Sequence, residues 1–339
     1  MSGGLLILGG GEIGELLAER EEEIAAAVDR AYRVHHAGQS SLPHSLFLRF
    51  PGDDTNRIIA LPAFLGDGFA LAGMKWISSF PGNVSRGIPR ASAVLVLNDC
   101  ETGLPEAILE GSLISARRTA ASAALAARAL HRGPVGRVGL IGTGLINFEV
   151  VRFLRRLMGA DTFLLHDLDA GRAERFAAEA ASSLGVEATV AGSLEEVLAA
   201  CPVTSLATTA TRPWVSDLSP CTPGATILHV SLRDLTPEVI LACDNVVDDV
   251  DHVCRAQTSV HLAEQATSGR GFIRCALAEI LAGTQPARRD DSSIAVFSPF
   301  GLGVLDLAVG QLALEAARAA GRGTRLPSFF SFDMGALFT

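Results

Sequence analysis

A strand, turn and helix pattern between residues 137 and 157 constrains the fold more than any other stretch of the chain. An apolar run, Val138–Ile141, ends in Gly142-Thr143-Gly144, and apolar residues then return at helical spacing. In a dinucleotide-binding turn the first glycine permits the turn, the second admits a pyrophosphate, and free helix N–H groups face the phosphates. Asn147 replaces the third glycine, and a ligand-free glycine turn is the alternative interpretation. The pattern predicts cofactor contacts at Gly142, Gly144, Leu145 and Ile146.

The residues after this helix support a dinucleotide. A second apolar run, Thr162–Leu165, precedes Asp167, which lies 23 residues beyond Gly144. At about this spacing, an acidic residue at the end of the second strand binds the adenosine ribose. A carboxylate there disfavours a 2′-phosphate, so the sequence predicts NAD. A solvated strand-end aspartate is the alternative, and the nearby Arg172 leaves NADP open.

Composition limits the class of protein. A chain of 339 residues can form two domains with a large core. It is 48% hydrophobic, yet no uninterrupted apolar run reaches the roughly 18–20 residues that a membrane span needs. The first residues carry no basic segment of the signal-peptide kind. Six cysteines without metal-ligand spacing indicate a reduced, cytoplasmic protein with no structural metal. A net charge of −9 without a basic stripe argues against nucleic-acid binding.

A literal GxGxxG motif occurs much earlier, at Gly9, Gly11 and Gly14. The next 25 or so residues are rich in Glu and Ala and predict one helix. No second strand with an acidic end follows at the required spacing. We therefore interpret this motif as an imitation of the nucleotide turn.

Residues 45–109 have the pattern of a β-rich region. Short apolar runs alternate there with turn clusters, which predicts hairpins and an antiparallel or mixed sheet. An Ala-rich helix is predicted at 112–131, with Ser112 as its N-cap and Gly133-Pro134 at its end.

From residue 133 to 303, predicted strands alternate with helices, which is typical of a parallel sheet. The predicted fold class is α/β: a Rossmann-type doubly wound parallel sheet of residues 133–303, which binds NAD. A second, β-rich domain comprises residues 1–132 and 304–339 and carries the candidate substrate contacts. The helix predicted at 304–320 completes that domain.

Some candidate functional residues follow from this plan. Lys75 is the only lysine among 28 basic residues, and an ammonium, unlike a guanidinium, can lose its proton when desolvated. Chance survival of one lysine is the alternative. Ligands of open α/β sheets lie beyond the carboxyl ends of the strands, where Thr209, Ser231 and Asp234 are predicted. Asp234 is the only carboxylate expected beside a nicotinamide, unless it caps the helix that begins near Thr236.

Several segments together resemble one known family, and the similarity covers nearly all of the chain. They are IIALPAFLG (58–66), AGMKWISSFPGN (72–83), NDCETGLPEAILEG (98–111), ISARRTAASAALAA (114–127), VGLIGTG (138–144) and FGLGVLDLAVGQLALEAA (300–317). The chain is similar to the ornithine cyclodeaminase/mu-crystallin family. GMKWISSFPGN, RGIPRASAV (86–94) and VSLRDL (230–235) are most similar to its branch of N-(2-amino-2-carboxyethyl)-L-glutamate dehydrogenases.

The resemblance implies roles for individual residues. Lys75 matches the lysine that holds the substrate carboxylate, Arg118 an arginine of the substrate and cofactor site, and Asp167 and Thr209 nucleotide contacts. Arg49 is our choice for the early substrate arginine, with His44 as the nearest alternative. Asp234 matches the catalytic aspartate of cyclodeaminases, but the Pro-Gly-Lys that follows it in those enzymes is missing here.

The resemblance also implies a reaction. In that branch, NAD-dependent oxidation and hydrolysis yield 2-oxoglutarate and L-2,3-diaminopropionate, a building block of siderophores and peptide antibiotics. Arg49, Lys75 and Arg118 would hold the several carboxylates of this small substrate, and Asp234 or Lys75 would supply acid–base catalysis. An ornithine cyclodeaminase, an imine or ketimine reductase, and a non-catalytic NAD(P)-dependent binding protein of the crystallin type are the alternatives. The resemblance also implies a homodimer formed through the β-rich domain, residues 1–132 and 304–339, which is then the domain for substrate binding and dimerisation.

Overall fold

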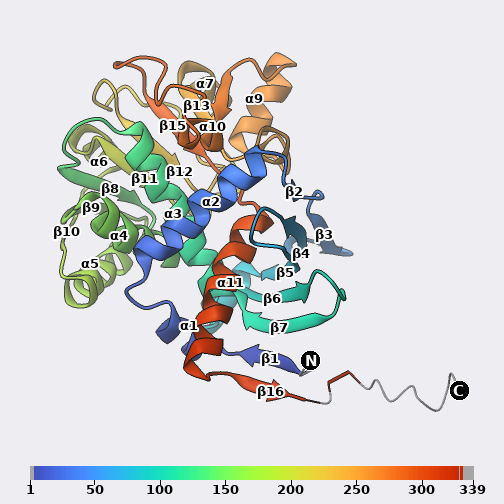
Figure 1. Cartoon of the computed structure of the whole chain (residues 1–339). Helices are drawn as coiled ribbons and strands as arrows, with labels where there is room; N and C mark the ends of the chain where they lie inside the picture. The colour runs from blue at the N-terminus through green and yellow to red at the C-terminus, as the bar shows by residue number, and fades with distance from the viewer. Residues whose placement is uncertain (1–3, 328, 331–339) are drawn as a thin grey trace, which may run out of the picture. The chain divides into compact units, whose positions relative to one another are not determined.

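The computed structural model describes residues 4–327 and 329–330, and the chain divides into two compact units (Figure 1). The first unit combines residues 1–20, 37–115 and 303–339, and the second combines residues 21–36 and 116–302. The predicted domain boundaries differ from this division at two places. Helix α2 (Glu21–His36) belongs to the second unit, where it packs against α4 and α10, and so does most of α3 (Gly111–Leu130).

The first unit is built on a mixed sheet. Its strand order is β16-β1-β7-β6-β5-β4-β2, with β3 paired to β4. All of these pairings are antiparallel except that of β1 with β7. The hairpins predicted for residues 45–109 therefore form. The strands are β1 (Leu5–Leu8), β2 (Ser40–Ser41), β3 (Leu46–Phe50), β4 (Asp53–Leu65), β5 (Leu71–Ser79), β6 (Ala91–Asp99), β7 (Pro105–Glu110) and β16 (Thr324–Leu326).

Helix α11 (Gly303–Ala320) packs on β4, β5 and β6 of this sheet, as Figure 1 shows. The face of the sheet that it covers carries Leu95, which is fully buried. A short 3₁₀-helix, η1 (Pro81–Arg86), connects β5 to β6. The β-rich region and its C-terminal helix thus form one core, because α11 covers an apolar sheet face that would otherwise meet water.

Of two local predictions in this part of the chain, one is confirmed and one is wrong. The Glu- and Ala-rich stretch forms one helix, α2, as predicted. The glycine motif before it opens a separate short helix, α1 (Gly10–Leu16), and Glu19 between the two helices has a left-handed backbone with φ of 56°. Ser112 does not cap α3: its Oγ accepts a hydrogen bond from Ala93 N at 2.8 Å. The Glu110 carboxylate caps this helix by accepting from the N–H groups of Ser112 and Leu113.

The second unit contains a wholly parallel sheet of order β10-β9-β8-β11-β12-β15-β13-β14. Strands β11, β12, β13 and β15 are buried along their whole length, as expected when helices cover both faces. This confirms the predicted doubly wound sheet. The strands are β8 (Arg137–Ile141), β9 (Thr162–His166), β10 (Glu187–Val190), β11 (Val203–Leu206), β12 (Thr226–His229), β13 (Asp244–Val247), β14 (Ile273–Ala276) and β15 (Ala295–Ser298).

A large apolar core joins one face of this sheet to α6, α7, α8 and α9. It combines alternate strand residues, such as Ile141, Leu206 and Ile227, with Val197 of α6 and Ile240 of α7. Helices α4 and α5 contact each other, and α4 also contacts β11, whereas α5 contacts β9 and β10. The bounds of the helices are α4 (Leu145–Met158), α5 (Ala170–Leu184), α6 (Leu194–Ala200), α7 (Pro237–Ala242), α8 (Val250–Val253), α9 (Ser259–Thr267) and α10 (Leu277–Leu281).

The early GxGxxG motif lies in the first unit. It follows β1 and opens α1, but β1 pairs with β7 and β16 in the mixed sheet. The later glycine turn follows β8, an interior strand of the parallel sheet between β9 and β11. Among the described residues, no helix is both long and apolar enough to cross a membrane.

Candidate functional site

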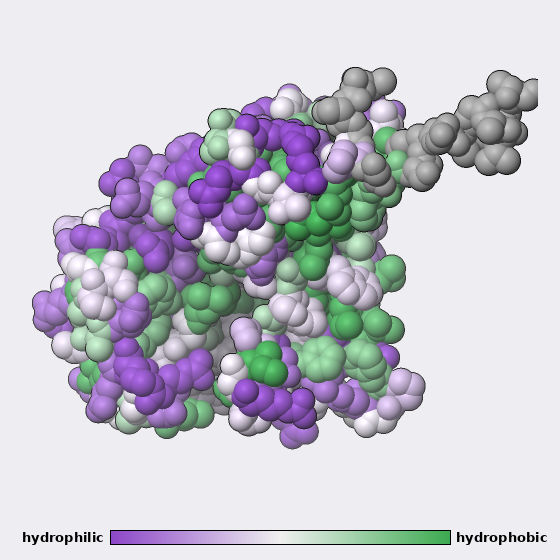
Figure 2. All heavy atoms as spheres, turned by 90° about the horizontal axis from the view of Figure 1, so that it is seen from below, coloured by the Kyte–Doolittle hydropathy of each residue, from purple (hydrophilic) through white to green (hydrophobic). Residues whose placement is uncertain are grey.

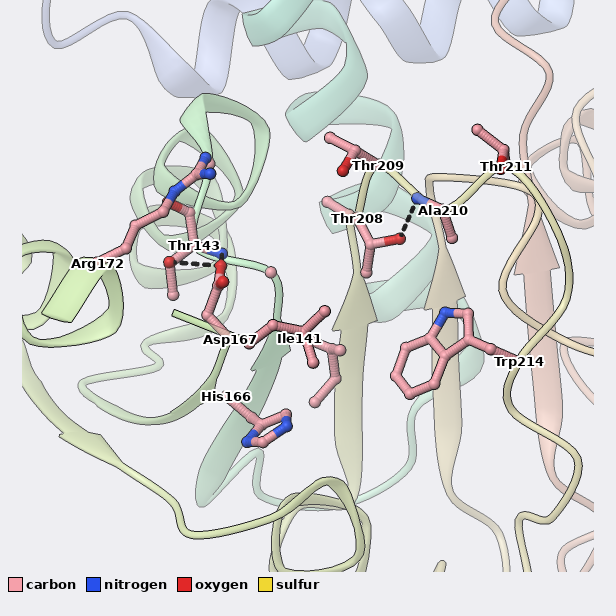
Figure 3. Close-up of a pocket in the computed structure, with 14 residues that line it drawn as sticks. Ile141, Thr143, His166, Asp167, Arg172, Thr208, Thr209, Ala210, Thr211 and Trp214 are labelled. Carbon is pink, nitrogen blue, oxygen red and sulfur yellow. Dashed lines mark hydrogen bonds between the residues drawn. The ribbon is translucent and has the colours of Figure 1, made fainter. Parts of the chain in front are cut away.

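A pocket of about 350 Å³ lies at the carboxyl ends of β8, β9 and β11, the position expected for a ligand of a doubly wound sheet. Figure 3 shows its walls, with Asp167 and Trp214 at opposite sides. Fourteen residues line it: Ile141, Gly142, Thr143, Gly144, His166, Asp167, Leu168, Arg172, Ala207, Thr208, Thr209, Ala210, Thr211 and Trp214.

The glycine turn after β8 shapes the floor of this pocket. Gly142 has φ of 86°, and a Cβ added there would lie 2.6 Å from the carbonyl oxygen of Ala207. Gly144 is the N-cap of α4, and a Cβ there would meet only the Arg172 guanidinium, at 3.5 Å. The N-terminus of α4 is thus open to an anion, so the turn fits a pyrophosphate.

Asn147 explains why the third glycine can be absent. Its side chain is fully buried, and Nδ2 donates to the carbonyl oxygens of Ile141 and Gly142 at 3.1 and 2.6 Å. Its Oδ1 accepts from Ser205 Oγ at 2.8 Å, which ties α4 to β11 as well as to β8. A third glycine normally allows close helix–strand packing. Here three hydrogen bonds hold the helix in place, a role that the sequence did not reveal.

Asp167 ends β9 beside the turn. Its Oδ2 accepts from both Thr143 N and Thr143 Oγ1 at 2.7 Å (Figure 3). Its Oδ1 accepts from Asp169 N at 3.1 Å. Partial burial raises the pKa of this carboxyl, but these hydrogen bonds and the nearby Arg172 lower it overall. Asp167 is therefore a fixed anion that can accept hydrogen bonds from a ribose.

Arg172, on α5, reaches back to the same turn. Its Nε donates to Thr143 O at 3.3 Å, and its side chain lines the pocket. The guanidinium thus lies beside both Gly144 and Asp167, and its positive charge offsets the charge of that carboxylate.

The predicted cofactor residues divide into two groups. Gly142, Gly144, Asp167 and Thr209 line the pocket. Leu145 is 56% exposed and lines a neighbouring depression, whereas Ile146, Ser231 and Arg118 are not among the lining residues. Ser231 follows β12, and its Oγ contacts Asp234 Oδ2.

Asp234 is fully buried, and both of its carboxylate oxygens have partners. Oδ1 accepts from Thr208 Oγ1 and, at 3.0 Å, from Trp214 Nε1, and Oδ2 accepts from Ser231 Oγ. Burial raises the pKa of this carboxyl, but hydrogen bonds with His229, Ser231 and Thr208 outweigh that effect and lower it to about 2. Asp234 does not cap α7, which begins after Thr236.

His229, also fully buried, supports the Asp234 loop. Its Nε2 lies 3.1 Å from Asp234 N and 3.5 Å from Asp234 Oδ2, and its Nδ1 lies 3.1 Å from Ser298 Oγ. The ring therefore contacts both the main chain and the carboxylate of Asp234.

Lys75 lies on β5 in the first unit and is 3% exposed. Its Nζ donates to Asp306 Oδ2 at 2.7 Å and to Ser115 Oγ at 3.0 Å. Asp306 is not among the predicted site residues, although an aspartate in the apolar run of α11 signals a buried partner.

The structure does not bring Arg49 close to Lys75. Arg49 is exposed on β3 and lies opposite Arg57 of β4, whereas Lys75 lies opposite Leu61. Arg57 and Leu61 are four residue steps apart, which corresponds to about 13 Å of strand. His44, before β3, is exposed too.

Arg118 is 7% exposed on α3 in the second unit. Its guanidinium nitrogens lie 2.9 Å from the point where a side chain on Gly301 would begin. The backbone of that loop is fixed by Asp248, whose carboxylate accepts from Phe300 N and Gly301 N. A buried cation thus lies against a loop that can approach it only because residue 301 is glycine.

No group of three or more His, Cys, Asp or Glu side chains that could hold a metal ion occurs in residues 4–327 and 329–330.

A parallel sheet with a glycine turn, an acidic end to its second strand and a pocket over both defines an oxidoreductase that uses a dinucleotide. Residues 11–321 match the ornithine cyclodeaminase/mu-crystallin family, and the chain belongs to that family.

Three relatives illustrate the range of activities in the family. The chain is 28% identical to N-((2S)-2-amino-2-carboxyethyl)-L-glutamate dehydrogenase of Staphylococcus aureus, over 95% of this chain and 98% of the relative. The structure of Δ¹-pyrroline-2-carboxylate reductase of Thermococcus litoralis, solved with NADH and L-proline, is 27% identical, with a TM-score of 0.89 over 95% of this chain and 100% of that one. An archaeal alanine dehydrogenase dimer with bound NAD is 27% identical, with a TM-score of 0.87 over 96% and 100% of the two chains.

Proposed function

We propose that this protein oxidises N-(2-amino-2-carboxyethyl)-L-glutamate with NAD⁺ and water, and releases 2-oxoglutarate, L-2,3-diaminopropionate, NADH and a proton. The near full-length similarity to the Staphylococcus aureus dehydrogenase carries the proposal. The segments GMKWISSFPGN, RGIPRASAV and VSLRDL, which resemble that branch, support it. The product would serve the biosynthesis of a siderophore or a peptide antibiotic.

The second unit would bind NAD through the residues of its pocket. Bound NAD⁺ supplies a hydride acceptor for the Cα of the glutamyl part of the substrate. Gly142 and Gly144 leave room for the pyrophosphate at the N-terminus of α4, and Asp167 accepts hydrogen bonds from the adenosine ribose. Thr209 and the Ser231 loop position the nicotinamide ring.

The predicted substrate has several carboxylates, and buried cations suit it. Lys75 and Arg118 would each bind a carboxylate, with a bidentate contact available only to the arginine. Arg49, or His44 in its place, would be a further contact. Acid–base catalysis falls to Lys75 or Asp234, because one group must accept the amine proton or activate the water that hydrolyses the imine.

Purified protein, NAD⁺ and the amino-carboxyethyl glutamate test the proposal directly. We expect NADH to appear in step with equal amounts of 2-oxoglutarate and diaminopropionate, measured by absorbance and mass spectrometry. Lys75→Arg keeps the positive charge but not the ammonium, so unchanged turnover would limit Lys75 to charge alone. Absence of NADH from the wild-type reaction would reject the proposed reaction.

The similarity to a pyrroline-2-carboxylate reductase favours ketimine reduction as the second candidate. That activity predicts consumption of NADH or NADPH with a cyclic imine. An ornithine cyclodeaminase would release proline and ammonia from ornithine, and a crystallin-type binding protein would bind the cofactor with no turnover. A panel of these substrates with NAD⁺, NADP⁺ and their reduced forms separates the four possibilities.

We further propose that the protein is a homodimer formed through the first unit's sheet. One face of that sheet exposes Leu46, Trp76 and Val94, which the strand register places in one row, at 69%, 39% and 41% exposure. Hydrophobic residues also gather in Figure 2 on the side where Figure 1 shows this sheet. An exposed apolar face of this kind typically marks an interface. Light scattering should give the dimer mass, and Leu46→Glu with Trp76→Glu should give the monomer mass.

A further inference from the structure

The carboxylate of Asp234 is engaged with the wall of the dinucleotide pocket through two separate side chains. Thr208 and Trp214 both line the pocket, and both donate to the same oxygen, Asp234 Oδ1. Figure 3 shows Thr208 and Trp214 on the same side of the pocket. The Trp214 side chain is 42% exposed, and its indole N–H is held by Asp234.

The backbone of Asp234 also holds the segment that carries Trp214. Its carbonyl oxygen accepts from Trp214 N and from Val215 N, both at 2.8 Å, and Thr236 N donates to Val215 O at 3.0 Å. The loop that carries Trp214 is therefore docked onto the Asp234 loop by main chain and side chain together. Any shift of Asp234 would move the indole that borders the pocket.

This engagement leaves Asp234 poorly suited to take a proton. Thr208, Trp214 and Ser231 supply donors to its two oxygens, His229 lies beside Oδ2, and the residue has no exposed surface. A general base works best with a pKa near the working pH, whereas hydrogen bonds hold the pKa of this carboxyl at about 2.

We propose that Asp234 is a positioning residue: it fixes Thr208 and Trp214 as the wall of the dinucleotide pocket, and it does not exchange a proton during the reaction. The assignment refines the site of the proposed function and separates Asp234 from Lys75 as candidates for acid–base catalysis. It also identifies Trp214, which the sequence analysis did not select, as the residue through which Asp234 acts on the cofactor.

The chain has two tryptophans, so Trp76→Phe leaves Trp214 as the only one and gives a parent protein for the test. In this parent, Trp214 emission should be quenched when NADH binds, because reduced nicotinamide absorbs in the range of tryptophan emission. Asp234→Asn keeps the shape of the side chain but turns an amide N–H toward some of these donors. Asp217→Asn, at an exposed aspartate of the same unit, is the matched control.

In Asp234→Asn we expect a shift of Trp214 emission, weaker quenching by NADH, and a dissociation constant for NAD⁺ raised about tenfold, as for the loss of one hydrogen bond to a charged group. The acid limb of the kcat–pH profile should keep its midpoint. Asp217→Asn should change none of these quantities. The emission and binding measurements need no amine substrate, so they remain informative if the proposed reaction fails.

Trp214→Phe provides a second route if Asp234→Asn does not fold. In a protein that retains Trp76, Trp214→Phe should also raise the dissociation constant for NAD⁺. The double variant with Asp234→Asn should raise that constant by less than the product of the two single effects, because each substitution removes the same contact between Asp234 and Trp214. Unchanged NAD⁺ binding and emission in Asp234→Asn would overturn the proposal. So would loss of the acid limb with a drop in kcat of about 10²–10⁴-fold, the cost of removing a general base.

Discussion

Asp248 provides a stringent test of the electrostatics of the second unit. Its carboxylate is buried at the end of β13 and accepts hydrogen bonds from the N–H groups of Asp249, Phe300 and Gly301. Burial raises the pKa of this carboxyl to about 6 despite those hydrogen bonds, which act to lower it. We predict that Asp248→Asn changes the pH dependence of stability in a defined window.

The sign and size follow from proton linkage. The folded protein holds this proton up to a pH of about 6, whereas the unfolded chain releases it near the ordinary value of 3.8. The stability that this group contributes is therefore complete below the unfolded pKa and lost as pH rises through the folded pKa. A rise from 3.8 to about 6, at 1.36 kcal/mol per pKa unit, amounts to about 3 kcal/mol.

Urea unfolding at a series of pH values from about 4 to 8, followed by Trp214 emission in a Trp76→Phe parent, measures this effect. Trp214 lies in the second unit, so its emission follows the unit that contains Asp248. The free energy of unfolding of Asp248→Asn minus that of the parent should rise by about 3 kcal/mol across the window and then level off. Replacing the carboxylate by an amide also loses hydrogen bonds. That loss shifts the difference curve by the same amount at every pH and does not change its shape.

Asp161→Asn, at an aspartate that is 73% exposed in the same unit, controls for the removal of one charge. Its difference curve should lack the rise of about 3 kcal/mol expected for the buried site. A difference curve for Asp248→Asn that is flat between pH 4 and 8, or that falls, would refute the assignment of a buried carboxyl with a raised pKa.

Three further predictions concern the two units separately. Asp167→Ala should weaken NAD⁺ binding by about 10- to 150-fold, because losing a hydrogen bond to a charged group costs about 1.5–3 kcal/mol. The variant should weaken NADP⁺ binding less, and equal losses for the two cofactors in calorimetry would contradict the ribose assignment. Gly142→Ala should destabilise the second unit by about 1–3 kcal/mol in urea unfolding, because its φ is 86° and a Cβ would lie 2.6 Å from Ala207 O; unchanged stability would show that the turn relaxes. Lys75→Met should lower the free energy of unfolding by about 3–5 kcal/mol, because it breaks the buried ion pair with Asp306. The double variant Lys75→Met with Asp306→Leu should regain thermal stability but not turnover, and a Lys75→Met protein as stable as wild type would contradict the pairing.

Local patterns in the sequence were sufficient to predict the parallel sheet and its nucleotide turn. The run Val138–Ile141, the glycines after it and Asp167 lie within about 30 residues, and each is a signal of short range. The alternation of strands and helices then fixed the sheet type, because βαβ connections produce parallel neighbours. Strand β11 stops at Leu206, so Thr208 and Thr209 lie in the loop beyond its carboxyl end, the region where Thr209 was predicted.

Contacts between distant segments could not be predicted in this way. Glu110 replaces Ser112 as the cap of α3 because Ser112 is engaged by the neighbouring strand β6, a tertiary contact. Asp306 meets Lys75 across 231 residues of chain. Helix α2 joins the second unit through α4 and α10, which come more than 100 residues later. The periodicity of each segment predicts a helix or strand but not the surface it packs against.

Asp167 and Asp234 both follow strands of the parallel sheet, so their positions in the sequence do not distinguish their roles. The number of hydrogen-bond acceptor sites that each carboxylate still has free does distinguish them. An ionised carboxylate offers about four lone-pair sites. Asp167 uses two of them on Oδ2, both with Thr143 of the glycine turn, and one on Oδ1 with Asp169 N, and its side chain is partly exposed at the pocket. One acceptor site on Oδ1 therefore remains for a ribose hydroxyl.

Asp234 differs in each of these respects. Its oxygens meet Thr208, Trp214 and Ser231, with His229 packed beside them, and no part of the residue is exposed. A ligand hydroxyl or amine could reach Asp234 only by displacing one of these protein donors, at the cost of leaving that buried donor unpaired. We therefore expect ligands to form hydrogen bonds with Asp167 directly and to sense Asp234 only through the indole and hydroxyl that it holds. A ligand-bound structure in which Asp234 keeps its contacts to Thr208 and Trp214 would support this distinction, and one in which Asp234 turns toward the ligand would contradict it.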